Sequence, residues 1–358
     1  METFKLALVL SGGGVRAVAF HTGVVRWLFA EGHNEKIEEI SSVSGGSIFL
    51  ALLLHFNRRR FPKNQVELEA ALQGIQELVT STSFQARYIL RSLLDVPTWI
   101  ECGANHLSSV LKEIIGIDFC ISELPRKPKC WINATNYESG ANWFFTDDRM
   151  GDWRFGYVHE PCVPLAEAVA ASAGYPFYIG ALRLNTKGAR FVGYDGSDAG
   201  PTAARDSVWL WDGGVYENTG LERFHKPGRG LRSGISRLLV SDASGHIVSL
   251  PRKNLLLQPF LSPRRLVEIV MSQTRALRAR LAVAEFIENK NGLYFQIGAN
   301  TKDFYDLDEY ERKKLDESGA FARSFKTNLK KMTDDEFNNI SKYAFDIAKN
   351  TQKRYQIL

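Results

Sequence analysis

The most constraining feature of this chain is a strand–turn–helix unit that occurs twice within its first 56 residues. The first copy has a β-type run at residues 5–10, a glycine turn at 11–14 and a helical stretch at 15–31. The second has a β-type run at 37–43, a turn at 44–46 and a helical stretch at 47–56. Strands that alternate with helices in this way begin a parallel sheet with covering helices. The stretch 47–56 is apolar on all sides, so we expect that helix in the interior.

The rest of the chain extends the same architecture. Residues 129–136 and 143–146 are expected to pair around a turn, 164–172 to form a helix of small residues, and 208–211 and 237–241 to form further strands. Two C-terminal stretches have side chains at helical spacing on one face, namely Leu266, Ile269, Val270, Gln273, Leu277 and Leu281, then Phe337, Ile340, Ala344 and Ile347. We therefore expect a single domain over residues 1–358, with helices of about 262–358 packed on the sheet.

Composition limits the class of protein and its compartment. With 358 residues, 44% of them hydrophobic and 24% charged, the chain can bury a full core and is ordinary for a globular protein. Its longest apolar runs, at 6–10 and 48–54, are too short to span a bilayer. Residues 1–4 lack the basic start and the long apolar stretch of a signal peptide. We therefore expect a cytoplasmic protein.

Cysteine content and net charge are less decisive. The four cysteines are scattered without a Cys-x-x-Cys pair, which favours free thiols over a zinc site or a disulfide framework. The net charge of +5 suits an anionic membrane surface as well as nucleic acid, so it does not choose between them.

The first turn, Ser11-Gly12-Gly13-Gly14, lies between a strand and a helix and is followed by Val15 and Arg16. Consecutive glycines leave backbone N–H groups unshielded at a helix N-terminus, where they can hold a phosphate or an oxyanion. The loop is no Walker A motif, because no Gly-Lys-Ser/Thr follows it. By itself, such a turn is structural about as often as it is functional.

The second turn, around Ser44, has the character of a nucleophile elbow. An elbow needs a serine on a strained strand-to-helix turn, with small neighbours that let strand and helix approach closely. Gly46 lies two residues after Ser44, but Ser42 stands two residues before it, where glycine is usual. The alternative is that Ser44 only caps the following helix.

The third candidate is Asp212, which ends a hydrophobic strand and precedes Gly213 and Gly214. A carboxylate beside two glycines can approach another loop closely, and it could deprotonate a serine hydroxyl directly in the part that histidine plays in a triad. The alternative is a simple turn aspartate.

The three motifs occur in the order, spacing and contexts of the patatin-like phospholipases, and the chain resembles bacterial members of that family from about Lys5 to Ser241. The resemblance implies a three-layer α/β/α sandwich around a mainly parallel sheet. Two residues depart from the family pattern: Ser42 replaces the first elbow glycine, and Ala17 stands where a glycine often follows the arginine. Both changes replace one small residue with another.

Carried over by position, the resemblance implies a catalytic dyad of Ser44 as nucleophile and Asp212 as its partner. The amides of Gly12, Gly13 and Gly14 become the oxyanion hole. Arg16 would brace this loop or attract an anionic head group, while Gly46, Gly213 and Gly214 support the two turns. The implied reaction is two-step acyl transfer through an acyl-enzyme, which requires no metal and no cofactor.

Several alternatives stay open. His21, His159, His225 and His246 belong to no motif, so we expect them to be structural or surface residues rather than bases. Residues 83–100 mix large apolar side chains with Arg87 and Arg91, which is typical of a lid or interfacial segment but also of an ordinary packed amphipathic helix.

We expect a phospholipase A or lysophospholipase that works on a phospholipid membrane surface, as a peripheral protein at the inner membrane. A carboxylesterase or acyltransferase for neutral lipids or thioesters, and a regulated lipid-binding effector on the same scaffold, are the alternatives. No nucleic-acid partner is expected. A homo-oligomer and a small-molecule activator are left open.

Overall fold

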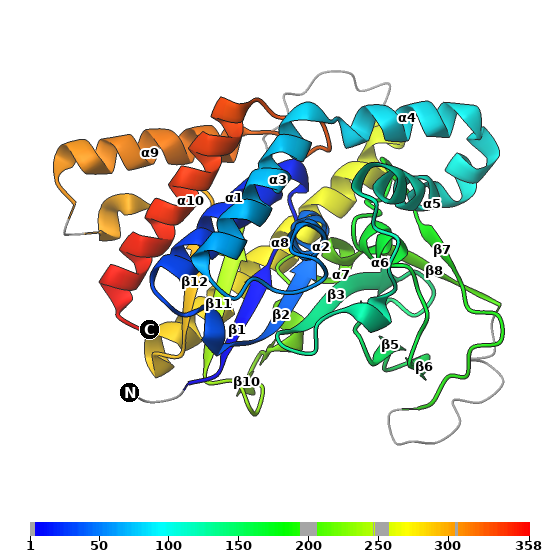
Figure 1. The fold of residues 1–358 in the computed structure, drawn as a ribbon, viewed down its shortest axis with the longest axis horizontal. Coiled ribbons are helices and arrows are strands. Elements are labelled where there is room, and N and C mark those ends of the chain that lie inside the picture. Colours follow the sequence, from blue (N-terminus) through cyan, green and yellow to red (C-terminus); the bar gives the residue numbers. More distant parts are fainter. Residues whose placement is uncertain (1–3, 194–205, 246, 248–257, 305–306) are drawn as a thin grey trace.

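The computed structural model describes residues 4–193, 206–245, 247, 258–304 and 307–358. A ten-stranded sheet runs through its centre (Figure 1). The strands of its parallel part lie in the order β12 (Gly292–Gln296), β11 (Arg237–Asp242), β1 (Leu6–Leu10), β2 (Ile37–Val43) and β3 (Lys129–Asn136). The two predicted opening strands, 5–10 and 37–43, are thus confirmed as neighbours.

Beyond β3 the sheet becomes antiparallel. The strands there are β4 (Asn142–Phe145), β5 (Arg149–Asp152), β6 (Gly156–His159), β7 (Leu182–Asn185) and β8 (Ser207–Asp212). Strand β3 pairs with β4 through residues 132–135 and with β8 through residues 134–136, where Ala134 lies opposite Asp212. A separate hairpin is formed by β9 (His225–Lys226) and β10 (Gly230–Leu231).

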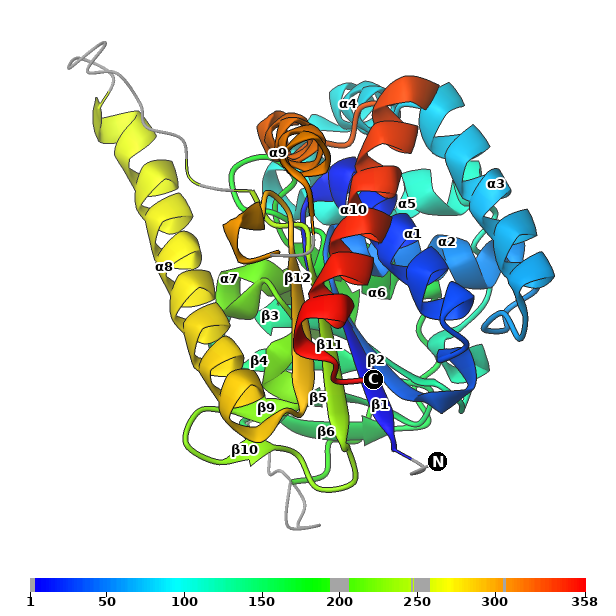
Figure 2. The same cartoon turned by 90° about the vertical axis from the view of Figure 1, so that its left-hand side faces the viewer.

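Helices cover both faces of the sheet, and the expected three-layer α/β/α fold is confirmed (Figure 2). One side carries α1 (Gly14–Ala30), α2 (Gly45–Phe56), α3 (Gln65–Ser81) and α10 (Asp334–Tyr355). The other side carries α7 (Gly213–Glu217) and α8 (Gln258–Asn289). The remaining helices are α4 (Phe84–Leu94), α5 (Val96–Ile115), α6 (Leu165–Ser172) and α9 (Glu309–Ser324).

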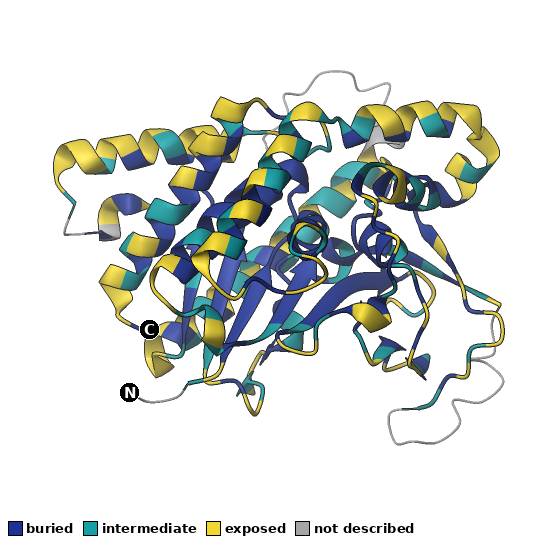
Figure 3. Cartoon of the chain, in the orientation of Figure 1, coloured by how far each residue is buried: buried dark blue, intermediate teal, exposed yellow. Residues whose placement is uncertain are grey.

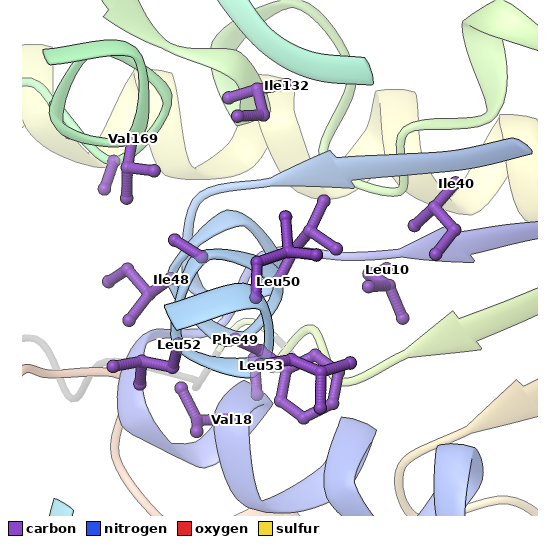
Figure 4. Close-up of a cluster of buried hydrophobic side chains, with 14 of the residues drawn as sticks. Leu10, Val18, Ile40, Ile48, Phe49, Leu50, Leu52, Leu53, Ile132 and Val169 are labelled. Atoms are coloured by element: carbon purple, nitrogen blue, oxygen red, sulfur yellow. The ribbon is translucent and has the colours of Figure 1, made fainter. Parts of the chain in front are cut away.

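The core lies between the sheet and α2, as the all-apolar sequence of that helix predicted. Residues 48–54 of α2 are at most 2% exposed, and every residue of β1 is buried. Figure 4 shows Ile48, Phe49 and Leu53 of this helix among side chains of the neighbouring strands and helices. Figure 3 shows the same contrast at the scale of the molecule, with a buried sheet beneath helices whose outer faces are exposed.

The C-terminal helix α10 packs along α1. Its predicted apolar face is confirmed, because Phe337, Ile340, Ala344 and Ile347 are all buried. The contact is close because Gly23 of α1 has no side chain: a Cβ there would overlap the Ser341 carbonyl oxygen and lie 2.8 Å from the Ala344 Cβ.

The interpretation of α8 as a helix that packs through its apolar stripe is wrong. The helix forms, but Leu266, Ile269, Val270, Leu277 and Leu281 are all between 41% and 61% exposed. Among the residues of α8 whose burial the structure describes, 262–289, the buried ones are Arg275, Ala282 and Phe286. Three ion pairs hold this side of the helix against the body of the protein, Arg275 with Asp242, Arg278 with Glu222 and Glu285 with His225, and the apolar stripe faces outward.

None of the helices in the described part of the chain is both long and apolar enough to cross a membrane.

The Gly23 contact predicts a loss of stability on substitution. Although alanine favours a helix by about 1 kcal/mol over glycine, we expect Gly23→Ala to lower the free energy of unfolding by roughly 1–3 kcal/mol, because α10 must move away. Urea unfolding measures the change. Gly32→Ala is the control, since Gly32 has no atom within 4 Å of an added Cβ and its positive φ of 70° alone should cost about 1 kcal/mol. An unchanged or raised stability of Gly23→Ala would contradict the packing.

Candidate active site

Ser44 lies at the sharp turn between β2 and α2. Its backbone has φ 50° and ψ −117°, a conformation that is strained for a residue with a Cβ. The turn fits only because its neighbours are glycines: a Cβ on Gly46 would overlap the Leu10 carbonyl oxygen, and one on Gly45 would overlap the backbone of Gly14. Ser44 therefore has the strained strand-to-helix geometry of a nucleophile elbow.

A series of hydrogen-bonded, buried hydroxyl groups holds the backbone of the elbow. The Ser44 amide donates to the Ser172 Oγ at 2.9 Å, and the Ser172 and Ser47 hydroxyls are 2.9 Å apart. The Ser47 hydroxyl donates to the Ser42 Oγ at 3.0 Å. Ser42, which departs from the usual elbow glycine, is thus the end of this series. Sequence reasoning missed Ser172, because nothing local marks one serine of a small-residue helix.

Asp212 reaches the elbow from the end of β8. Its side chain is 2% exposed, and its Oδ1 accepts a hydrogen bond from the Gly214 amide at 2.7 Å. A Cβ on Gly213 would lie 2.5 Å from the Asn133 carbonyl oxygen, so glycine is needed where this loop crosses β3.

The electrostatics of Asp212 suit a base. Burial raises the pKa of its carboxyl to about 7, while hydrogen bonding by the Gly214 amide and the Ser44 hydroxyl opposes the rise. A carboxylate that titrates near neutral pH can both take and return a proton. The structure thus brings together Ser44 and Asp212, which the sequence separates widely.

The glycine loop begins α1 beside the elbow. Gly13 and Gly14 have φ of 151° and 62°, values that favour glycine. The Gly12 amide already donates to the Asn218 carbonyl oxygen at 3.0 Å, so the expectation that it supplies an oxyanion donor is corrected. Of the three predicted donors, the amides of Gly13 and Gly14 remain, and their role as an oxyanion hole stays a prediction. Asn218 is a second residue that sequence reasoning missed.

Arg16 braces this loop against the C-terminal part of the chain. Its guanidinium is buried and donates to the carbonyl oxygens of Ala243 and Phe325, at 3.2 and 2.5 Å, and to the Thr327 hydroxyl at 2.9 Å. Burial lowers its pKa to about 10, and the nearby Asp242 opposes the decrease. Of the two predicted roles, this geometry favours bracing.

The histidines take no part in the described site. His21 is buried between the Ser241 hydroxyl and the Ser11 carbonyl oxygen, and burial lowers its pKa to about 4. His225 pairs with Glu285 at 2.8 Å. His159 ends the strand β6, and His246 lies outside the described residues. Within the described residues, no histidine is hydrogen-bonded to Ser44 or Asp212.

Metal ligands show no comparable clustering. Among the residues that the structure describes, no group of three or more His, Cys, Asp or Glu side chains could hold a metal ion.

Fold and site together define an α/β protein in which a serine elbow meets a buried carboxylate. The family model for patatin-like phospholipases matches residues 8–225. The chain therefore belongs to the patatin-like phospholipase family, and this membership supports lipid acyl hydrolysis.

Solved structures show the same fold. Human GIVD cytosolic phospholipase A2 superposes with a TM-score of 0.57 at 13% identity, over 99% of this chain and 63% of the human chain. The same human protein in complex with methyl γ-linolenyl fluorophosphonate and terbium chloride gives 0.55 at 14% identity, over 99% and 59%. This chain thus spans less than two thirds of those chains. No curated protein matches it in sequence.

The raised pKa of Asp212 predicts the pH dependence of activity. A protonated carboxyl cannot accept the serine proton, so kcat/KM for a soluble ester should rise about tenfold per pH unit below pH 7 and level off above it. Stopped or continuous assays from pH 5 to 9 measure the profile, with circular dichroism as the control for folding. A flat profile between pH 5 and 8 would show that Asp212 is not the base.

The series of buried hydroxyl groups predicts a positioning role for Ser172. Ser172→Ala removes the acceptor of the Ser44 amide, a loss worth about 1–3 kcal/mol for a buried donor. We expect kcat to fall roughly tenfold and KM to change less than about threefold. Ser92→Ala, which removes a buried hydroxyl of α4, is the matched control and should keep kcat. Equal loss of kcat in both variants would indicate a general effect on folding.

Proposed function

We propose that this protein is a serine acyl hydrolase that cleaves the fatty acyl esters of membrane phospholipids or lysophospholipids with a Ser44–Asp212 dyad. The observation that carries the proposal is the meeting of a strained serine elbow with a buried carboxylate whose pKa is raised to about 7. Membership of the patatin-like phospholipase family supports the lipid class of the substrate.

In the first step, Asp212 accepts the Ser44 hydroxyl proton while the oxygen attacks the ester carbonyl carbon. The carbonyl oxygen becomes an oxyanion, which the amides of Gly13 and Gly14 stabilise at the N-terminus of α1. Each such donor contributes roughly 3–4 kcal/mol in related acyl-transfer reactions. Asp212 then returns the proton to the departing alkoxide, and the fatty acyl group stays on Ser44.

In the second step, water attacks the acyl-enzyme and gives up its proton to Asp212. Collapse of the tetrahedral intermediate releases the fatty acid and restores the Ser44 hydroxyl. The buried network of Ser172, Ser47 and Ser42 keeps the elbow in place through both steps. No side chain other than the dyad needs to move a proton.

The proposed site of action is the surface of the inner membrane, reached from the cytoplasm. The net charge of +5 supports attraction to anionic lipids.

The test is fatty acid release from mixed phospholipid vesicles by wild type, Ser44→Ala and Asp212→Asn. Wild type should release fatty acid, and both variants should lose at least about 1,000-fold in rate, because the nucleophile or the base is gone. Ser81→Ala and Asp335→Asn make the same chemical changes at exposed positions of α3 and α10 and should match wild type.

Each other result rejects a part of the proposal. If Asp212→Asn keeps most of its rate while folded, another base operates. If wild type cleaves a soluble p-nitrophenyl ester or a neutral lipid but no phospholipid, the carboxylesterase or acyltransferase alternative replaces the phospholipase. If wild type cleaves no ester, the scaffold is a lipid-binding effector or needs an activator.

A further inference from the structure

The hairpin formed by α4 and α5 exposes an unusual amount of apolar surface. Leu90, Leu93, Leu94 and Ile100 are 61%, 68%, 79% and 76% exposed, and Ile89, Val96 and Trp99 are exposed as well. Among the large apolar side chains of α4, the buried ones are Phe84 and Tyr88. An exposed patch of this kind on a globular protein marks an interaction site.

The first half of α8 has the same character. Leu266, Ile269 and Val270 are 61%, 41% and 51% exposed, and no residue from 262 to 274 is buried. Figure 2 shows this end of α8 leaning away from the body of the molecule. Among the described residues, the apolar side chains of this half of the helix are left exposed, so they are available to a partner.

One loop, residues 175–180, joins the two apolar elements. On the side of the hairpin, the Tyr88 hydroxyl donates to the Ile179 carbonyl oxygen at 3.0 Å. On the side of α8, the Arg264 guanidinium lies over the Tyr178 ring at 4.3 Å. The loop itself exposes Phe177 by 59% and Tyr178 by 52%. The apolar surface is therefore continuous from the hairpin to α8.

The same loop borders the dyad. The Asp212 amide donates to the Gly174 carbonyl oxygen at 3.1 Å, immediately before the loop. Tyr175 interacts electrostatically with both Asp212 and Glu268 of α8. Figures 1 and 2 place α4 and the start of α8 at the end of the molecule where β1 and β2 finish. The surface thus surrounds the approach to Ser44.

Charge on the surface favours an anionic partner. Residues 262–281 of α8 contain five arginines, of which Arg275 and Arg278 are paired with Asp242 and Glu222, so the remaining three face one acidic residue, Glu268. Arg264 and Arg265 share Glu268, and Arg280 is exposed. The hairpin is close to neutral, so its contribution is apolar. Apolar side chains with flanking arginines are typical of helices that lie in the interface of an anionic bilayer.

We propose that the α4–α5 hairpin, loop 175–180 and the first half of α8 form a docking surface for an anionic phospholipid bilayer. The proposal rests on the proposed function, because it assigns the surface from which a phospholipid reaches the dyad. Docking buries the exposed leucine, isoleucine and tryptophan side chains among the acyl chains. The opening that leads to Ser44 then faces the bilayer.

The experiment is flotation with vesicles of phosphatidylethanolamine and phosphatidylglycerol, compared with vesicles of phosphatidylcholine alone. Wild type should float with the anionic vesicles and bind the neutral ones at least about tenfold more weakly. The double variant Leu93→Glu/Leu94→Glu and the single variant Ile269→Glu should each lose at least about tenfold in binding, because each removes a large apolar side chain from the interface.

Matched controls make the same change elsewhere. Val66→Glu, at the other end of α3 from the hairpin, and Ile287→Glu, in the far end of α8, replace side chains that are 80% and 59% exposed. Both should bind vesicles like wild type. Rates on vesicles relative to a soluble ester should fall in the docking variants and stay constant in the controls.

The docking proposal and the catalytic proposal fail separately. Ser44→Ala should float like wild type while releasing no fatty acid, so a protein that binds vesicles without cleaving them contradicts catalysis alone. The docking proposal is overturned if wild type does not float or if the docking variants float like the controls. It is also overturned if light scattering shows that wild type is a dimer and that the docking variants are monomers. The last result would assign the surface to a second copy of the chain.

Discussion

The close approach of two parallel strand ends is the constraint on which the site depends. Strands β1 and β2 are neighbours in register, so their following turns emerge side by side. Backbone contacts there leave no room for Cβ atoms at Gly45 and Gly46, which touch the glycine turn and the end of β1. Ser44 and the predicted oxyanion amides are therefore positioned by the sheet itself, whose geometry is hard to deform.

Segments far apart in the chain complete what the sheet begins. The pairing of β8 with β3 places Asp212 beside the elbow. The glycine turn is held by Asn218, whose carbonyl oxygen accepts a hydrogen bond from the Gly12 amide. Arg16 connects the same turn to residues 325–327, beyond the part that the family model matches. The C-terminal region thus supports the site that the N-terminal motifs form.

The sequence predicts those features that depend on contacts between residues close together in the chain. Local patterns predicted the opening strands, the buried α2 and the apolar face of α10. Family resemblance placed Ser44 beside Asp212. The outward stripe of α8 could not be predicted, because the helix is held by contacts across the fold, among them the ion pairs of Arg275 with Asp242 and of Glu285 with His225. Ser172 and Asn218 were missed for a similar reason, since they act only through contacts across the fold.

The long reach of Arg16 has a consequence for the protein while it is being made. Ser44 and the glycine turn leave the ribosome early, but Phe325, one of the acceptors of the buried Arg16 guanidinium, follows 309 residues later. An unpartnered buried cation is costly, so the turn cannot settle in its final form before then. A nascent chain that lacks residues 325–327 therefore has no partners for the Arg16 guanidinium on that side, and its glycine turn is not yet braced.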